Sequence, residues 1–229
     1  MAASHRLYLV PGMFGFGRLA GYDYFHHLRS AIEERFAAAG VELVTRVVAT
    51  EPTSSLRHRA SVLATHVDDE LPEGDGPIHL LGHSTGGLDA RLLLSPSANL
   101  HIPADTTSWT ERVRTCLSVN CPHYGTPLAA HFATVSGTRL LYALSLLTVI
   151  SLTLGEPSLA LASRVLNGLG DVEELVSGDI GMIRRSTDSI LRFVDREARE
   201  EIRMFLRKMR ADQGGIIQIM PESMDLFNA

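Results

Sequence analysis

Residues 78–88 read IHLLGHSTGGL. The apolar run leads into the spacing G-x-S-x-G around Ser84, and apolar residues at helical spacing follow it over 88–93. A serine in this spacing lies on a sharp, strained turn between a strand and a helix, which lifts its hydroxyl out of the sheet. Gly82 and Gly86 carry no Cβ atom, so strand and helix can approach closely around that turn. The stretch therefore predicts Ser84 as a nucleophile. The alternative is a glycine-rich turn without chemistry.

Composition limits the classes of protein that this chain can belong to. Its 229 residues fit one large domain, and an apolar content of 45% supports a sizeable core. A net charge of −5, with no long basic run, gives nucleic-acid binding no electrostatic support. Cys116 and Cys121 lie on one apolar segment at an odd separation, which on a strand points them to opposite faces. We therefore expect buried free thiols, and neither a metal site nor a cofactor.

The amino-terminal segment shows no targeting signal. Its apolar run, residues 7–10, is too short for the core of a signal peptide and ends at Pro11 and Gly12. We therefore predict a cytoplasmic protein.

Strand-like and helix-like segments alternate through the first half of the chain. Strands are expected over 7–10, 41–48 and 77–81, and helices over 23–39, over 54–71 with Ser54 as its cap, and over 85–94. This order predicts a mostly parallel sheet with helices on both faces. Catalytic groups in such a sheet lie beyond the carboxyl ends of the strands, where Ser84 and the loop 11–14 both fall.

The second half of the chain has a helical pattern. After an irregular loop over 95–110, a fourth strand is expected over 113–121. The apolar run 140–154 is short and interrupted by hydroxyl residues, so we expect either a buried helix or a mobile lid over an apolar site, and no membrane span. Further helices are expected over 157–166 and over 186–209, the latter amphipathic and ended by Gly214 and Gly215. We interpret 128–210 as a helical lid or cap within a single domain, 1–229.

A serine nucleophile needs two kinds of help. Its hydroxyl is weak until a general base removes the proton, and backbone N–H groups must stabilise the charge that develops on the substrate carbonyl, at about 3–4 kcal/mol for one donor. One donor is expected from Thr85, the residue after the nucleophile. The other is expected from the loop after the first strand, and Met13 is the first choice. The alternative for that loop is a tight turn that only ends the strand.

Three segments carry a resemblance to a known family. They are 9–15 (LVPGMFG), 82–91 (GHSTGGLDAR) and 120–127 (NCPHYGTP). In this order they resemble the α/β-hydrolase lipases, in particular the bacterial triacylglycerol lipases, although Pro11 stands where that family usually has histidine. The resemblance implies the α/β-hydrolase fold with a helical lid after Pro127.

The resemblance also implies roles for individual residues. Ser84 would be the nucleophile, and the backbone N–H groups of Met13 and Thr85 would form the oxyanion hole. His83 and His123 occupy motif positions that are not the triad base, so structural or site-lining roles are expected for both.

The triad base is the point at which the chain departs from the family. The triad order in this fold is Ser, then Asp or Glu, then His, and the family places the last two beyond the lid, after the final strands. The histidines that follow Ser84 are His101, His123 and His131. We hypothesise that the chain is an amino-terminal portion of a longer hydrolase, whose acid and base lie downstream or on another polypeptide. A rival hypothesis completes the triad internally with Asp105 and His131.

Two functions follow from these patterns. The first is a serine ester hydrolase acting on lipid-like or apolar acyl esters through an acyl-enzyme on Ser84, with transient contact of its lid with a membrane or lipid interface; thioesterase and acyltransferase chemistry would use the same intermediate. The alternative is a non-catalytic protein of this fold that binds a hydrophobic ligand or a partner. A sheet edge left open by missing strands would also allow a homodimer or a partner chain.

Overall fold

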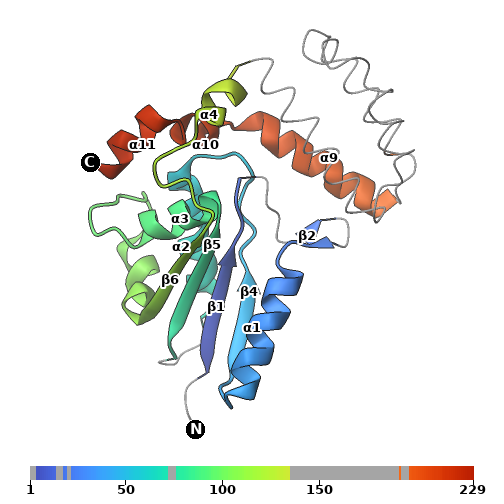
Figure 1. Cartoon of the computed structure of the whole chain (residues 1–229), viewed down its shortest axis with the longest axis vertical. Helices are drawn as coiled ribbons and strands as arrows, with labels where there is room; N and C mark the ends of the chain where they lie inside the picture. The colour runs from blue at the N-terminus through green and yellow to red at the C-terminus, as the bar shows by residue number, and fades with distance from the viewer. Residues whose placement is uncertain (1–3, 14–17, 20–21, 72–75, 135–190, 192–195) are drawn as a thin grey trace.

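A parallel four-stranded sheet forms the centre of the protein (Figure 1). The computed structural model describes residues 4–13, 18–19, 22–71, 76–134, 191 and 196–229. The strand order is β4-β1-β5-β6, and all three pairings are parallel. The bounds are His5–Val10 for β1, Leu43–Val47 for β4, Ile78–His83 for β5 and Val113–Val119 for β6. The predicted α/β architecture is confirmed.

Helices cover both faces of this sheet. On one face lie α2 (Leu56–Glu70) and α3 (Thr85–Leu93), which bury a cluster that includes Tyr8, Leu63 and Leu80. On the other face α1 (His26–Ala38) packs over a smaller cluster. Strand residues alternate between the two faces, so β1 and β5 contribute side chains to both clusters.

Two helices begin later than predicted. The first helix starts at His26 because Tyr22–Asp23 (β3) pairs with Arg18–Leu19 (β2) in a short antiparallel ladder. The second is capped by Ser55, whose side chain accepts the His58 N–H at 3.2 Å. The prediction of Ser54 as the cap is therefore wrong. The Ser54 hydroxyl instead donates to the Glu51 carbonyl at 3.4 Å.

The segment predicted as an irregular loop contains a 3-10 helix, η1 (Ala104–Arg112). Its turns are supported by hydroxyl-to-carbonyl bonds from Thr107 to Ala104 and from Thr110 to Thr107, at 3.1 and 2.7 Å. Trp109 is 3% exposed and packs against the α2–α3 side of the core. The sequence reading missed this element because hydroxyl residues favour turns and one buried tryptophan shows no periodicity.

β6 lies at one edge of the described sheet and is largely exposed, with Leu117 50% and Val119 40% exposed. Both cysteines are free, as expected, but Cys116 on this strand is exposed and Cys121 is only half-buried. The expectation of buried thiols is therefore wrong, because β6 lies at an edge of the described sheet and not in its interior. Cys121 also lies beyond the end of β6, where strand alternation no longer applies.

The helices that follow β6 lie across the carboxyl end of the sheet in Figure 1: α4 (Pro127–Phe132), α9 (Arg196–Ala211), α10 (Gly214–Gln218) and α11 (Pro221–Asn228). Ala198, Ile202 and Leu206 of α9 are buried, as the predicted amphipathic pattern requires. The predicted segments 140–154 and 157–166 lie outside the described residues, as does most of 186–195. Within the described residues, no helix is long and apolar enough to cross a membrane.

Candidate active site

Ser84 lies between the last residue of β5 and the first residue of α3. Its backbone has φ 54 and ψ −128, a conformation that L-residues rarely adopt. The turn is held by two backbone bonds: the Ser84 N–H donates to the Val119 carbonyl at 2.9 Å, and the Gly87 N–H donates to the Ser84 carbonyl at 3.1 Å. The strained strand-to-helix turn expected from the sequence is present.

The glycines around this turn allow backbones to meet. A Cβ atom added at Gly82 would lie 2.3 Å from the backbone of Gly86, and one added at Gly86 would lie 2.2 Å from the Val10 carbonyl oxygen. Neither position therefore has room for a side chain. The close approach predicted for Gly82 and Gly86 is confirmed, and it packs α3 against the end of β1.

Gly12 brings the loop after β1 against the serine. A Cβ atom added at Gly12 would lie 2.6 Å from Ser84 Cβ and 3.0 Å from Ser84 Oγ. Met13, the next residue, is 5% exposed, and Thr85, the first residue of α3, is 1% exposed. The structure thus places both expected oxyanion donors directly beside the contact between Gly12 and Ser84.

The backbone N–H groups of Met13 and Thr85 are available as donors. Within the described part of the chain, neither N–H donates a backbone hydrogen bond outside its own helix. For Thr85 this follows from its position, since N–H groups in the first turn of a helix have no partner inside the helix. Their role as oxyanion donors stays a prediction.

A buried ion pair contacts the loop that follows β1. Arg59 of α2 and Asp89 of α3 are both 0% exposed and pair at 2.7 Å. Burial raises the pKa of Asp89 to about 6, although the Arg59 guanidinium and its hydrogen bonds act in the opposite direction. Arg59 also donates to two carbonyls, those of Pro11 and Glu51, each at 2.7 Å.

The sequence reading missed Arg59 and Asp89, although one signal was present. Arg59 falls three residues after Leu56 and one before Ala60, inside the apolar stripe of α2. A charged residue in the buried stripe of an amphipathic helix needs a buried partner. The sequence alone did not show which acidic residue that partner is, because the pairing depends on how α2 and α3 pack.

His83 is fixed by an aromatic partner. Its Nδ1 atom lies 2.6 Å from the Tyr24 hydroxyl, and burial lowers the pKa of His83. His83 leaves β5 on the side of the sheet that α1 covers, together with Leu81 of the α1-side cluster. This arrangement agrees with the expected structural or site-lining role.

Within the described residues, none of the candidate acid and base residues is hydrogen-bonded to Ser84. Asp105 lies in η1, which leads into the amino end of β6, whereas Ser84 follows the carboxyl end of β5. His131 is exposed on α4, and the His123 carbonyl instead accepts the Asn228 side chain at 2.9 Å. Among the described residues, no histidine is hydrogen-bonded to the Ser84 hydroxyl.

The described ranges also contain no group of three or more His, Cys, Asp or Glu side chains placed to hold a metal ion. The candidate site consists of the strained Ser84, the two expected backbone donors and the buried Arg59–Asp89 ion pair.

Comparison with known proteins relates this chain to lipases. No family model matches the chain. It is similar to a triacylglycerol lipase of Vibrio cholerae serotype O1, with 34% identity over 93 residues, which is 40% of this chain and 28% of the relative. It is also similar to a triacylglycerol lipase of Pseudomonas fragi, with 27% identity over 53% of this chain and 36% of the relative. The matched stretches thus span about a third of the curated relatives.

Solved structures give the fold. Staphylococcus hyicus lipase matches with a TM-score of 0.50 and 17% identity, over 98% of this chain and 62% of that chain. Lipase 1 from Pelosinus fermentans matches with a TM-score of 0.50 and 18% identity, over 99% of this chain and 64% of that chain. The chain therefore has the α/β-hydrolase fold of lipases, and its sequence resembles the triacylglycerol lipases.

Proposed function

We propose that this protein is a serine ester hydrolase in which the Ser84 hydroxyl attacks the ester carbonyl carbon and forms an acyl-enzyme. The observation that carries the proposal is the backbone of Ser84, held at φ 54 between β5 and α3. Such strain at a residue other than glycine costs on the order of 1–3 kcal/mol, persists only where the surrounding structure enforces it, and is concentrated at functional sites. The similarity to triacylglycerol lipases supports the same reaction class.

The backbone N–H groups of Met13 and Thr85 are the proposed oxyanion hole. Gly12, the residue before Met13, lies in close contact with the Ser84 side chain, and Thr85 is the first residue of α3. Donors fixed before the reaction stabilise the developing oxyanion without reorganisation, which is why they lower the barrier.

The acid and base of the triad are proposed to come from further polypeptide. All 10 histidines of the chain lie in its described part, and none is hydrogen-bonded to the Ser84 hydroxyl there. The exposed apolar residues of β6, Leu117 and Val119, support a further strand or helix on this edge, because parallel strands are usually buried on both faces. We place the missing groups on the polypeptide that covers this edge.

The proposed substrates are lipid-like or apolar acyl esters. The support is the resemblance to lipases together with the apolar sequence of 140–154, which suits a lid over an acyl chain. A transient contact with a lipid interface through that segment belongs to the same proposal. A series of p-nitrophenyl esters of increasing acyl length tests it, and a preference for acetate over long acyl groups would contradict it.

Labelling with a fluorophosphonate tests the nucleophile. We expect a polypeptide extended beyond residue 229 to be labelled, the Ser84→Ala variant to be unlabelled, and the Ser97→Ala variant, changed at a serine outside the site, to be labelled like the parent. Loss of the triad base lowers turnover by about 10⁶. The 229-residue chain alone should therefore react with the fluorophosphonate far more slowly than the extended polypeptide.

A second candidate function is supported by the missing base. A non-catalytic protein of this fold could bind a hydrophobic ligand or a partner at the same face, with Ser84 as part of the scaffold. Absence of labelling in both the chain and the extended polypeptide, with binding of a fatty acyl probe retained, would favour this candidate.

A further inference from the structure

Arg59 is a fully buried side chain that makes five hydrogen bonds to protein acceptors. Its Nε and Nη2 atoms donate to the Asp89 carboxylate at 2.7–3.2 Å, and the side chain is 0% exposed. The two remaining bonds go to main-chain carbonyls, of Pro11 and Glu51. One guanidinium thus joins α3, the loop after β1 and the loop after β4.

The bond to Pro11 acts next to the proposed oxyanion donor. Pro11 directly precedes Gly12, which touches Ser84, and Met13. The Pro11 carbonyl oxygen is confined from two sides, because Arg59 Nη2 donates to it at 2.7 Å and the Gly86 Cα hydrogens face it so closely that a Cβ there would lie 2.8 Å away. Fixing this carbonyl limits how the next peptide, which carries the Met13 N–H, can rotate.

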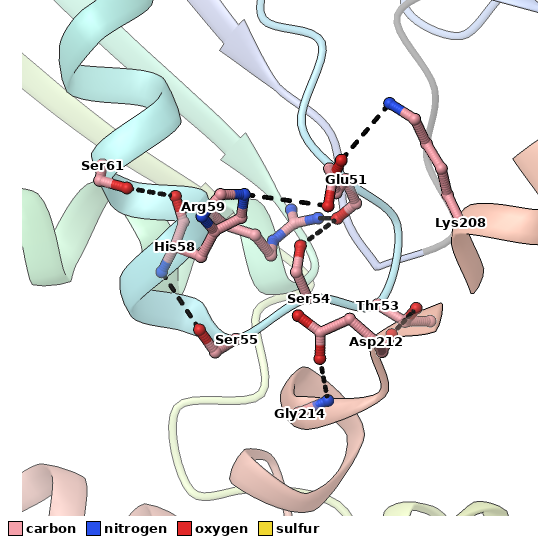
Figure 2. A network of polar contacts seen from close by, with 10 residues as sticks. All are labelled: Glu51, Thr53, Ser54, Ser55, His58, Arg59, Ser61, Lys208, Asp212 and Gly214. Carbon is pink, nitrogen blue, oxygen red and sulfur yellow. Dashed lines mark hydrogen bonds and ion pairs between the residues drawn. The ribbon is translucent and has the colours of Figure 1, made fainter. Parts of the chain in front are cut away.

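The bond to Glu51 ties the same guanidinium to a loop on which the carboxyl-terminal helices rest. Figure 2 shows this network around residues 51–55. The Gly215 N–H of α10 donates to the Thr53 carbonyl at 2.9 Å, and the Thr53 hydroxyl donates to the Asp212 carbonyl. Lys208 of α9 pairs with the Glu51 carboxylate at 3.4 Å. The loop 51–55 therefore lies between Arg59 and the helices α9 and α10.

We propose that Arg59 is a positioning residue. It couples the contact of α9 and α10 with the loop 51–55 to the position of the loop Pro11–Met13 beside Ser84. A shift of α9 and α10 moves the Thr53 and Glu51 backbone, and Arg59 transmits that shift to the Pro11 carbonyl. The catalytic consequence rests on the proposed function, whereas the coupling between the two loops does not.

The planar fork of arginine is what the site requires. Lysine would place one point charge near Asp89 and could not donate to both carbonyls and both carboxylate oxygens at once. A buried guanidinium needs acceptors for all of its N–H groups, and the two carbonyls accept from those that the Asp89 carboxylate leaves unpaired. The two carbonyl bonds are therefore the part of the geometry that the proposal uses.

The test compares Arg59→Met and Arg59→Lys with Arg57→Met, which changes an exposed arginine two residues away on the same helix. The first measurement is amide exchange at Gly215, relative to the buried Val48, which directly follows β4 and whose N–H bonds the Leu9 carbonyl of β1. We expect Arg59→Met to speed Gly215 exchange at least tenfold relative to Val48, Arg59→Lys to speed it less, and Arg57→Met to change it less than twofold.

The second measurement is the rate of fluorophosphonate labelling of Ser84 in the extended polypeptide. We expect a loss of about 100-fold in Arg59→Met, which is the loss typical of one oxyanion donor, and no loss in Arg57→Met. Unchanged relative exchange at Gly215 would overturn the coupling, even if labelling fell. Faster exchange with unchanged labelling would overturn the positioning of the Pro11–Met13 loop.

The outcomes separate the inference from the proposed function. If the parent polypeptide is not labelled, the proposed hydrolase fails, and Gly215 exchange still decides the coupling; a crystal structure of Arg59→Met with Gly12 still against Ser84 would then overturn the positioning. If Arg59→Met does not fold, Arg59→Lys decides both measurements, and parent-like values in it would overturn the proposal.

Discussion

The two faces of the sheet are built in different ways. On the α2–α3 face, α2 buries six residues, Leu56, Arg59, Ala60, Leu63, Ala64 and Val67, and an ion pair is fully enclosed. On the other face α1 buries none, and its Leu28 is 39% exposed. The strained serine and the loop beside it are held from the α2–α3 face. The difference indicates that rigidity is concentrated where the geometry of the site is set, because backbone strain persists only in surroundings that enforce it.

The largest expected effect is at Gly86, on the rigid face. Gly86→Ala would place a Cβ atom 2.2 Å from the Val10 carbonyl, between two backbones that cannot separate without moving α3 from β1. We expect it to lower the free energy of unfolding by about 3 kcal/mol or more. The control is Gly40→Ala at the end of α1, where φ is 69 but no atom lies within 4 Å, so only about 1 kcal/mol of backbone strain is expected. Equal losses in urea unfolding would contradict the contrast.

A core truncation compares the two helices directly. Leu63 on α2 is 0% exposed, so Leu63→Ala removes buried methyl groups and leaves a cavity, at an expected cost of about 3 kcal/mol. Leu28→Ala on α1 should change the free energy of unfolding by about 0.5 kcal/mol or less. Chemical denaturation of the two variants side by side measures this, and a cost at Leu28 as large as that at Leu63 would show that α1 is packed as firmly as α2.

The helix caps give a smaller contrast. The Ser55 hydroxyl caps α2, whereas the residue in the corresponding position of α1, Phe25, makes no side-chain cap bond. We expect Ser55→Ala to cost about 1 kcal/mol. Ser54→Ala should cost clearly less, because its hydroxyl makes only a long bond at 3.4 Å. The opposite ranking in thermal unfolding would restore Ser54 as the cap.

Features set by local sequence could be predicted, whereas features set by the packing of distant elements could not. The alternation of strands and helices, the turn at Ser84 and the placement of the loop after β1 near that turn follow from local patterns, because a five-residue spacing and short apolar runs dictate them. The pairing of Arg59 with Asp89 could not be predicted, since it depends on how two helices pack 30 residues apart in sequence.

Edges were harder to predict than the interior. The expectation of buried thiols rests on an apolar segment, whereas β6 is an exposed edge of the described sheet. Periodicity reports which side chains alternate, and it does not report whether another strand lies alongside. The position of the acid and base of the proposed triad could not be predicted for the same reason, because it depends on what lies alongside β6.

The smallest expected effect concerns pH on the α1 face. His5 Nδ1 and His79 Nε2 lie 2.9 Å apart with stacked rings, and burial, together with the charge of His5, lowers the pKa of His79. The folded state therefore keeps His79 neutral to a lower pH than the unfolded chain does. The contribution of neutral His79 to stability is present above the unfolded pKa of about 6.5, and it is lost as the pH falls below that pKa. We expect His79→Gln to reduce the loss of stability between pH 7.5 and 5.5. Urea unfolding at the two pH values measures this, with the exposed His27→Gln as control. An unchanged pH dependence in His79→Gln would show that the histidine pair does not resist protonation.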